Sequence, residues 1–317
     1  FGETGWFVFK EINNVWLHWE VREHLMLAEW LLPVGISFYT FQTIAYTVDI
    51  YRGKALPERH FGKFALFVSF FPQLVAGPIE RYNHLMPQLK NLKSFHYKAV
   101  TTGLIIMAVG FFKKVVIADR TAILVNKYFD EPGLYDGFTG FLTSILFYLQ
   151  IFCDFSGYTD IAIGAAMVIG VKLSNNFNRP YLASSFTDFW KRWHLTLTTW
   201  FRDYLYYWLR RGKKYSIGWS IFITFCVTGL WHGANWTFVV WGAIHGLLLV
   251  FERSTNDIRQ RLFRPFLKGN GRMVFMVVFQ VTVFLILSLT GILFRSPSLA
   301  DAGVIFSHIL QLKEGLF

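Results

Sequence analysis

Apolar and aromatic side chains recur at spacings of three and four residues between positions 186 and 208, a pattern that predicts an amphipathic helix. The apolar positions are Phe186, Phe189, Trp190, Trp193, Leu197, Trp200, Phe201, Tyr204 and Trp208. A second face carries Lys191, His194, Thr198 and Arg202. The segment holds five charged residues, and each costs about 2.5–3.5 kcal/mol at the bilayer centre on insertion scales. We therefore expect a helix that lies at the membrane interface or dips into a protein-lined cavity, and that does not cross the bilayer upright.

Residues 216–251 form an uncharged run of 36 residues, and His232 lies near its middle. A single span needs about 20 residues, so the run is too long for one span and short for two. Gly229 and Gly233 lie on either side of His232, and glycine is a poor residue for a helix interior. We predict two short or broken helices that meet near His232. An ionisable side chain at membrane depth is a candidate functional group.

Four other apolar segments are separated by basic or turn-rich stretches. Three have the length of a span: residues 25–50, 138–155 and 273–294. Residues 64–79 are shorter and contain two prolines, so we expect a re-entrant segment that does not cross the bilayer.

Polar residues interrupt two further apolar stretches. Lys113 and Lys114 lie within residues 99–118, and we expect both side chains to extend toward the membrane surface. The polar residues at 154–160 are expected to end one helix before the apolar pattern resumes at 161–171. The amide-rich residues 175–180 are predicted to form a loop.

The composition is that of a polytopic membrane protein, because 54% of the residues are hydrophobic and only 16% are charged. The net charge is +11, but the cations lie between apolar segments, as topology signals and lipid-headgroup contacts do, so nucleic acid is not expected as a partner. Cys153 and Cys226 lie in apolar segments and indicate no disulfide framework. We expect one membrane domain over residues 1–317. The chain does not begin with methionine, and we expect a fragment that lacks amino-terminal spans and its carboxy-terminal end.

Six motifs are spread over much of the chain: LPVGISFYTFQTIAYTVDIYRG (32–53), FFPQLVAGPIERY (70–82), CDFSGYTDIAIG (153–164), FWKRWH (189–194), TTWFRDYLY (198–206) and GLWHGANW (229–236). As a set they resemble the membrane-bound O-acyltransferase (MBOAT) family, in its bacterial branch for alginate O-acetylation and teichoic-acid D-alanylation. The resemblance implies an all-α, polytopic fold with short tilted and re-entrant helices around a central cavity. It also implies that His232 is the family's invariant catalytic histidine and that His194 is the second conserved polar position.

Both histidines are candidate catalytic residues. An imidazole can accept a hydroxyl proton near neutral pH, so His232 is the expected general base. The alternative is a buried histidine that bonds a helix carbonyl. His194 is expected to face the same cavity and to orient, polarise or relay protons to His232, and the alternative is a histidine at headgroup level. Because glycines flank His232, we expect few packing contacts to depend on it. No third ligand accompanies the pair, so a metal site is not expected.

Seven more residues are expected to bind substrate: Arg81, Asn178, Trp193, Arg202, Asp203, Trp231 and Asn235. The assignments of Arg81 and Asn178 rest mainly on the resemblance. For Arg202 and Asp203 the alternative is structural ion pairing. His245 lies in an apolar helix, where a hydrogen bond between helices is the expected role.

The resemblance implies acyl transfer, most simply of acetyl, to hydroxyls of a cell-envelope or exported polysaccharide or to a relay partner. The donor would be acyl-CoA (acetyl-CoA) or an acyl-carrier thioester from the cytoplasm, with no tightly bound cofactor. Expected partners are membrane lipid and a periplasmic or extracellular acyltransferase, in the cytoplasmic (inner) membrane of a bacterium. D-alanyl transfer to teichoic acid is the alternative within the family, although FPQLVAGP is closer to the alginate branch. A transporter or channel, or a structural subunit, is the alternative outside it.

Overall fold

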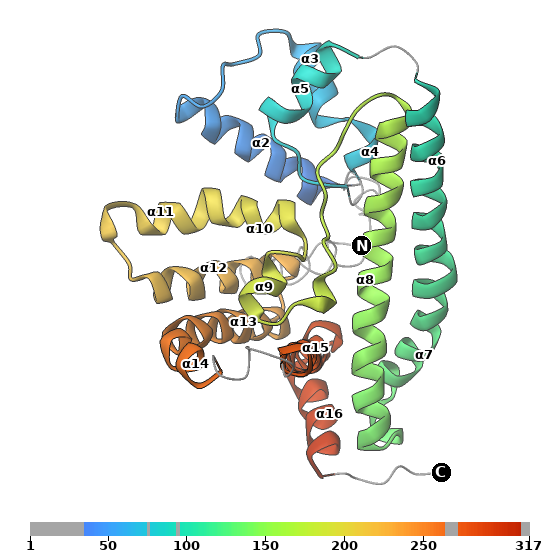
Figure 1. Cartoon of the computed structure of the whole chain (residues 1–317), viewed down its shortest axis with the longest axis vertical. Helices are drawn as coiled ribbons and strands as arrows, with labels where there is room; N and C mark the ends of the chain where they lie inside the picture. Colours follow the sequence, from blue (N-terminus) through green and yellow to red (C-terminus); the bar gives the residue numbers. More distant parts are fainter. Residues whose placement is uncertain (1–34, 75–76, 93–95, 264–271, 312–317) are drawn as a thin grey trace, which may run out of the picture.

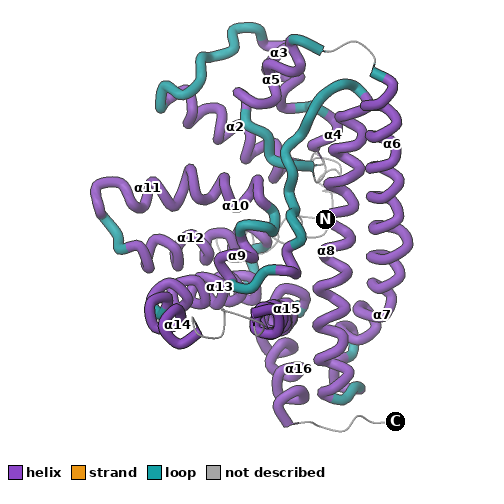
Figure 2. The backbone as a smooth tube through the Cα atoms, viewed as in Figure 1, coloured by secondary structure: helices purple, strands orange, loops and turns teal. Residues whose placement is uncertain are grey.

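The computed structural model describes residues 35–74, 77–92, 96–263 and 272–311, which form helices and connecting loops without a strand (Figure 1, Figure 2). The predicted all-α fold is confirmed for this part of the chain. Short helices dominate the amino-terminal half: α2 (Ile36–Tyr51), α3 (Phe61–Val68), α4 (Phe71–Leu74), α5 (Tyr82–Lys90), α6 (Tyr97–Phe111), the π-helical turn η2 (Phe112–Ala118), α7 (Asp119–Asp130) and the 3-10 turn η3 (Pro132–Leu134).

The carboxy-terminal half begins with the longest helix. Its elements are α8 (Gly137–Val168), η4 (Pro180–Leu182), α9 (Phe186–Trp190), α10 (Leu195–Phe201), the π-helical η5 (Arg202–Tyr206), α11 (Tyr207–Arg210), η6 (Arg211–Lys213), α12 (Ile217–His232), α13 (Trp236–Ser254), α14 (Asn256–Phe263), α15 (Arg272–Arg295) and α16 (Leu299–Gln311). The predicted re-entrant segment 64–79 corresponds to α3, α4 and the residues after them. Residues 25–34 of the first predicted span lie outside the described residues.

Three helical stretches are long and apolar enough to cross a membrane: Tyr97–Asp130, Gly137–Val168 and Arg272–Arg295. At 1.5 Å per residue the first two are about 50 Å long, well beyond the roughly 30 Å of a hydrocarbon core. Each must tilt or project from the bilayer if it spans. In Figure 1, α6 and α8 run along the long axis whereas α15 is seen end-on, so the three do not form an upright parallel bundle.

Two glycine pairs bring α6 and α8 into close contact. A Cβ atom on Gly103 would lie 2.7 Å from the carbonyl oxygen of Gly164, and one on Gly110 would lie 2.6 Å from that of Gly157. The pairs are seven residues apart on each helix, two turns, so both fall on one face. Small residues at such positions let helix backbones approach closely, as they do in membrane helix pairs.

The close contact places the lysines of η2 against acidic residues of α8. Lys113 Nζ lies 2.6 Å from Asp160 Oδ2, and Lys114 Nζ lies 2.6 Å from both Asp154 Oδ1 and Asp119 Oδ1. These ion pairs engage both ammonium groups, whereas the predicted extension of the lysines toward the membrane surface stays a prediction. The predicted helix end at 154–160 is wrong: α8 continues through it, because the carboxylates find their counter-ions on the neighbouring helix.

A second layer crosses the first. The stretch α10–α11 turns back into α12, and α13 follows beneath it in Figure 1, with these helices roughly perpendicular to α8. The largest buried cluster joins this layer to α8 and α15 and includes Tyr148, Phe189, Trp190, Trp241 and Leu287. The two histidines lie where the layers meet.

Candidate active site

His232 is the last residue of α12, and the predicted meeting of two short helices at this point is confirmed. Gly233 is extended, and a Cβ atom there would lie 2.5 Å from the ring of Phe238. Asn235 then caps α13: its Oδ1 accepts from the amide of Thr237 at 3.1 Å, and its Nδ2 donates to the carbonyl of Pro297 at 2.7 Å. Both ends of the Asn235 amide are thus engaged in holding the helix break.

Four aromatic rings surround the imidazole of His232. The ring centroids lie 4.6 Å from Trp231, 4.9 Å from Phe294, 5.4 Å from Trp241 and 6.3 Å from Phe238. The expectation that few packing contacts depend on His232 is therefore wrong. The residue is half-buried, and the described part of the chain offers its imidazole no hydrogen-bond partner. Packing orients the ring, and its nitrogens stay available for a substrate.

His194 lies at a second helix break, and the prediction of one continuous helix over 186–208 is wrong. Its backbone is left-handed, with φ 42° and ψ 56°, between α9 and α10. The loop after α8 holds this break: the amide of Leu195 donates to the carbonyl of Asn176 at 2.9 Å, and the amide of Asn178 donates to that of Arg192 at 2.9 Å. The hydroxyl of Thr196 also donates to Asn176 Oδ1 at 2.6 Å.

Trp231 lies next to both histidines. Its ring centroid is 6.5 Å from that of His194 and 4.6 Å from that of His232. His194 is only 3% exposed, and Phe155 packs edge-on against it at 4.6 Å. Its Nε2 is buried without a hydrogen-bond partner among the described residues. The structure therefore brings the two predicted histidines close to one indole, whereas a cavity that both face stays a prediction.

The charged candidates form a network around the π-helical turn η5. Arg202 Nε lies 2.9 Å from Asp203 Oδ1, and Arg81 Nη2 lies 3.8 Å from Asp203 Oδ2. The guanidinium of Arg81 also stacks over Tyr204 at 4.8 Å, and Arg52 Nη1 donates to the carbonyl of Asp203 at 3.1 Å. Arg202 and Asp203 thus form the structural ion pair that the sequence analysis gave as the alternative to substrate binding.

Trp193 and Asn178 lie away from the imidazole of His232. Trp193 is packed in an aromatic group on the α8 side, with ring centroids 5.1 Å from Phe177 and 5.5 Å from Phe189. Asn178 is exposed and contributes its backbone amide to the His194 break. The neighbouring Asn176 is fully buried and makes the contacts that position His194, a role that no feature of the sequence distinguishes from those of the other asparagines in this loop.

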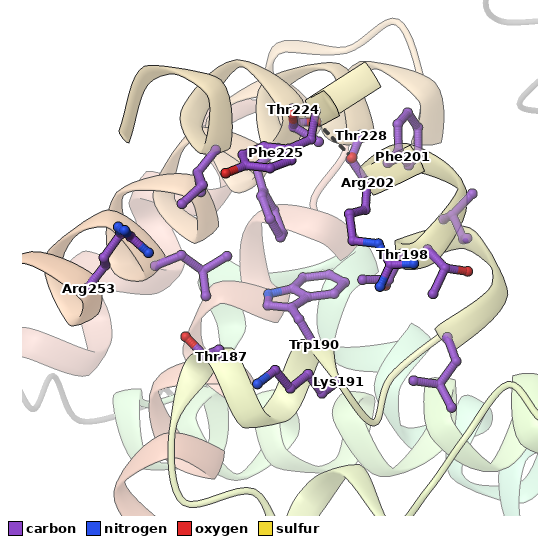
Figure 3. Close-up of a pocket in the computed structure, with 16 residues that line it drawn as sticks. Thr187, Trp190, Lys191, Thr198, Phe201, Arg202, Thr224, Phe225, Thr228 and Arg253 are labelled. Atoms are coloured by element: carbon purple, nitrogen blue, oxygen red, sulfur yellow. Dashed lines mark hydrogen bonds between the residues drawn. The ribbon is translucent and has the colours of Figure 1, made fainter. Parts of the chain in front are cut away.

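A cavity of 480 Å³ opens between α9–η5 and α12–α13 (Figure 3). Trp190, Phe225 and other apolar side chains form its walls, and Lys191, Arg202 and Arg253 lie around it. Lys191 and Arg253 have no ion-pair partner in the described part of the chain. Neither histidine lines the cavity, but two of its residues lead toward His232. Thr228 lies one turn before His232 in α12, and Trp190 packs against Trp241, whose ring contacts His232.

This site contains aromatic walls, two histidines at helix ends and a cation-edged apolar cavity. Among the described residues, no three histidine, cysteine or acidic side chains are grouped as a metal site requires. The sequence profile of the membrane-bound O-acyltransferase family matches residues 55–296, which include both histidines and all residues that line the cavity of Figure 3. The chain belongs to this family.

Three curated relatives show the range of its similarity. The MBOAT chain is 40% identical over 297 residues to a probable alginate O-acetylase of Azotobacter vinelandii, and 34% identical over 335 residues to a peptidoglycan O-acetyltransferase of Helicobacter pylori. It is 29% identical over 231 residues to a teichoic acid D-alanyltransferase of Bacillus subtilis. These alignments cover 92%, 97% and 68% of the chain, and 56%, 61% and 58% of the respective relatives.

The chain thus spans a little over half the length of the curated relatives it matches. The predicted resemblance to the alginate O-acetylation branch is confirmed, since that relative matches more of the chain, at higher identity, than the D-alanyltransferase does.

The predicted helix–helix role of His245 is also confirmed: its Nε2 lies 3.1 Å from the hydroxyl of Thr290, which joins α13 to α15.

Proposed function

We propose that this MBOAT chain transfers an acyl group, in the first place acetyl, from a thioester to a hydroxyl of an envelope polysaccharide or of a relay partner. The observation that carries the proposal is the imidazole of His232. It is held by aromatic packing at a helix break, half-buried and without a hydrogen-bond partner in the described part of the chain. Relatives named as alginate and peptidoglycan O-acetyltransferases support acetyl as the transferred group.

In the proposed reaction, His232 takes the proton of the acceptor hydroxyl as the oxygen attacks the thioester carbonyl. The C–O bond forms, the C–S bond breaks, and the departing sulfur receives the proton from the imidazolium, so the step is balanced without a further reactant. A thioester is already activated, and the site mainly has to hold it and the hydroxyl in register. His194 is the proposed positioning residue, acting through the shared Trp231.

We assign the cavity of Figure 3 to the donor. An acyl-CoA or a carrier-bound phosphopantetheine joins a flexible thioester arm to phosphate groups. Apolar walls suit the arm, and the unpaired Lys191 and Arg253 suit the phosphates. Contacts from Trp190 to Trp241 and from Trp241 to His232 connect the cavity wall to the proposed base. We place the protein in the cytoplasmic membrane of a bacterium, with a secreted acyltransferase as the partner.

Two alternatives have less support. D-alanyl transfer matches the relative that is less similar to this chain. A transporter would also carry charges at membrane depth. Here the lysines of η2 are paired with carboxylates of α8 and of the following α7, which accounts for these charges structurally.

The proposal is tested by thiol release from acetyl-CoA, or from an acetyl-carrier thioester, with the detergent-purified full-length protein and its partner. We expect release in the wild type and its loss in His232→Ala. His96→Ala, at an exposed position directly before α6, is the control and should retain activity. Full activity in a folded His232→Ala protein would overturn the assignment. Solute movement without any thiol release would favour the transporter.

A further inference from the structure

A second, smaller cavity lies between η2, α8 and the loop that follows α8. Its volume is 200 Å³, and it shares no lining residue with the cavity of Figure 3. Figure 2 shows this loop beside α8 on its way to α9. The lining is rich in groups that can donate hydrogen bonds, which belong to Lys113, Ser156, Thr159, Asn175, Asn176 and Arg179. Asp160 is the acidic residue of the lining.

Two buried hydroxyls of α8 lack partners in this cavity. Ser156 and Thr159 are each 2% exposed, and neither hydroxyl has a hydrogen-bond partner in the described part of the chain. They are three residues apart on the helix, so both lie on the same face. A serine or threonine inside a helix often donates to the carbonyl four residues earlier, as Thr224 and Thr228 do in α12. Because buried polar groups are nearly always hydrogen-bonded, the two hydroxyls indicate a partner inside the cavity.

The side-chain amide of Asn176 shows which kind of partner is missing. Its Oδ1 accepts from the backbone amide of Thr196 at 3.3 Å and from the Thr196 hydroxyl at 2.6 Å. A backbone N–H can only donate, so the oxygen of the amide faces Thr196 and the nitrogen lies on the other side. This nitrogen is buried and has no partner among the described residues. An NH₂ group needs an acceptor, which an anion supplies and a metal cation does not.

The charges of the lining restrict the ligand further. Lys113 Nζ lies 2.6 Å from Asp160 Oδ2, so these two residues together contribute no net charge. Arg179 has no ion-pair partner in the part of the chain that the structure describes, and it adds one positive charge. An anion that leaves water needs both hydrogen-bond donors and a counter-charge, and this lining provides them. The cavity therefore fits a ligand with one negative charge, small enough to share the space with water molecules.

A bound anion would connect three elements around the His194 break. The donors come from η2 (Lys113), from α8 (Ser156 and Thr159) and from the loop that holds Asn176. The backbone carbonyl of Asn176 in turn accepts from the amide of Leu195, the residue after His194, at 2.9 Å. The ligand would thus fasten the loop that holds this break to α8 and η2.

We propose that the cavity is a binding site for a small monoanion of the size of chloride, and that the bound anion stabilises the loop after α8. The three unpartnered donors and the uncompensated Arg179 are the observations that lead to this ligand class. The proposal is independent of acyl transfer, because binding and stability are measured without any substrate.

The test is a chlorine NMR linewidth titration of the full-length protein in detergent, with KCl added to a chloride-free buffer. Chloride that exchanges between protein and solution broadens the signal, and the excess broadening falls as a specific site fills. We expect saturable broadening in the wild type. Ser156→Ala/Thr159→Val should weaken chloride binding about tenfold or more, because it removes two hydrogen bonds to a charged ligand. Arg179→Gln should weaken it roughly fivefold, the upper range for an exposed pair of charges.

Thermal unfolding of the same proteins provides the second reading. A ligand that binds only the folded state raises the unfolding temperature. Chloride should therefore raise the unfolding temperature of the wild type more than that of the double variant in the same buffers, a comparison that removes the general effect of salt.

Each variant has a matched control outside the cavity. Ser144 is a buried serine of α8 whose hydroxyl has an acceptor in its own helix, and Arg211 is an exposed arginine of η6. Ser144→Ala and Arg211→Gln should both bind chloride as the wild type does. Absence of saturable broadening in the wild type would show that the cavity holds only water. Unchanged affinity in the folded double variant and in Arg179→Gln would place the bound chloride elsewhere, and either result would overturn the proposal. If the double variant does not fold, Arg179→Gln decides, because its position is exposed.

Discussion

Replacing His232 by phenylalanine separates its packing from its chemistry. Four aromatic rings contact the imidazole, and a phenyl ring can occupy the same space. Removing a fully buried phenylalanine side chain costs about 3–5 kcal/mol, and His232 is smaller and partly exposed, so His232→Ala should cost somewhat less, about 2–3 kcal/mol. His232→Phe keeps an aromatic ring of similar shape and slightly larger volume, and because the position is partly exposed it should change stability by less than about 1.5 kcal/mol.

Both variants lose the proposed base, and loss of a general base typically costs about 10²–10⁴-fold in rate. We therefore expect His232→Phe to unfold near the wild-type temperature and His232→Ala to unfold earlier, with thiol release lost in both. Thermal unfolding in detergent and thiol release from acetyl-CoA, each measured on the same preparations, provide the two readings. Substantial activity in His232→Phe would refute the role of His232, because the variant lacks any group that can take the proton. Equal stability of the two variants would refute the packing estimate.

Three further predictions concern the fold and the second histidine. Gly110→Ala should destabilise the protein by about 1–3 kcal/mol, because the added methyl overlaps a carbonyl of α8, whereas Gly133→Ala, with open space around it, should change the unfolding temperature little. The hydrogen bond from Lys90 lowers the pKa of Glu58 to about 2. The stabilising contribution of this carboxylate is therefore fully present above its unfolded pKa and should fall as the pH drops from 5 toward 2. Glu58→Gln should flatten this part of the curve of stability against pH. Asn176→Ala should lower thiol release and melt at a lower temperature than the wild type, because it removes the acceptor that holds the start of α10; wild-type turnover in this variant would contradict the positioning role.

The break at His232 could be predicted from the sequence because its causes are local. Gly229 and Gly233 are close to the histidine, and the run around it has a length that fits neither one span nor two. The structure ends α12 at His232 and begins α13 at Trp236, as such a pattern requires. His245 could be assigned for a related reason, since a polar ring in an otherwise apolar helix needs a partner on a neighbouring helix.

The break before His194 could not be predicted, because its cause is distant in the sequence. The apolar spacing of three and four continues across residues 191–194, and the left-handed backbone of His194 is held by a loop that precedes α9.

The opposite error occurred in α8. The polar stretch around Asp154 and Asp160 resembles a helix end, but ion pairs with lysines at least forty residues away let the helix continue. In both places tertiary contacts outweigh the local pattern.

The candidate site was predicted unevenly for the same reason. The two histidines stand out because ionisable residues are rare in apolar surroundings, whereas the loop residue that positions His194 is one of three asparagines in four positions. The sequence pointed to Asn178, and the structure buries Asn176 instead. Substrate binding by Asn235 stays a prediction, and the structure adds a role that was not predicted, because both ends of its amide hold the helix break.

Both histidines lie at helix ends, and this placement has a chemical consequence. Inside a helix, the side chains three and four residues away on either side cover a ring. His232 has no following turn, and His194 has no preceding turn of the same helix, so each ring is covered on one side only by its own helix. Trp231 packs near both rings, at 6.5 Å from His194 and 4.6 Å from His232. The half-buried ring of His232 can therefore be packed among aromatic side chains and still leave a nitrogen free for the proposed substrate, whereas the turns on both sides would cover an imidazole in the middle of α12.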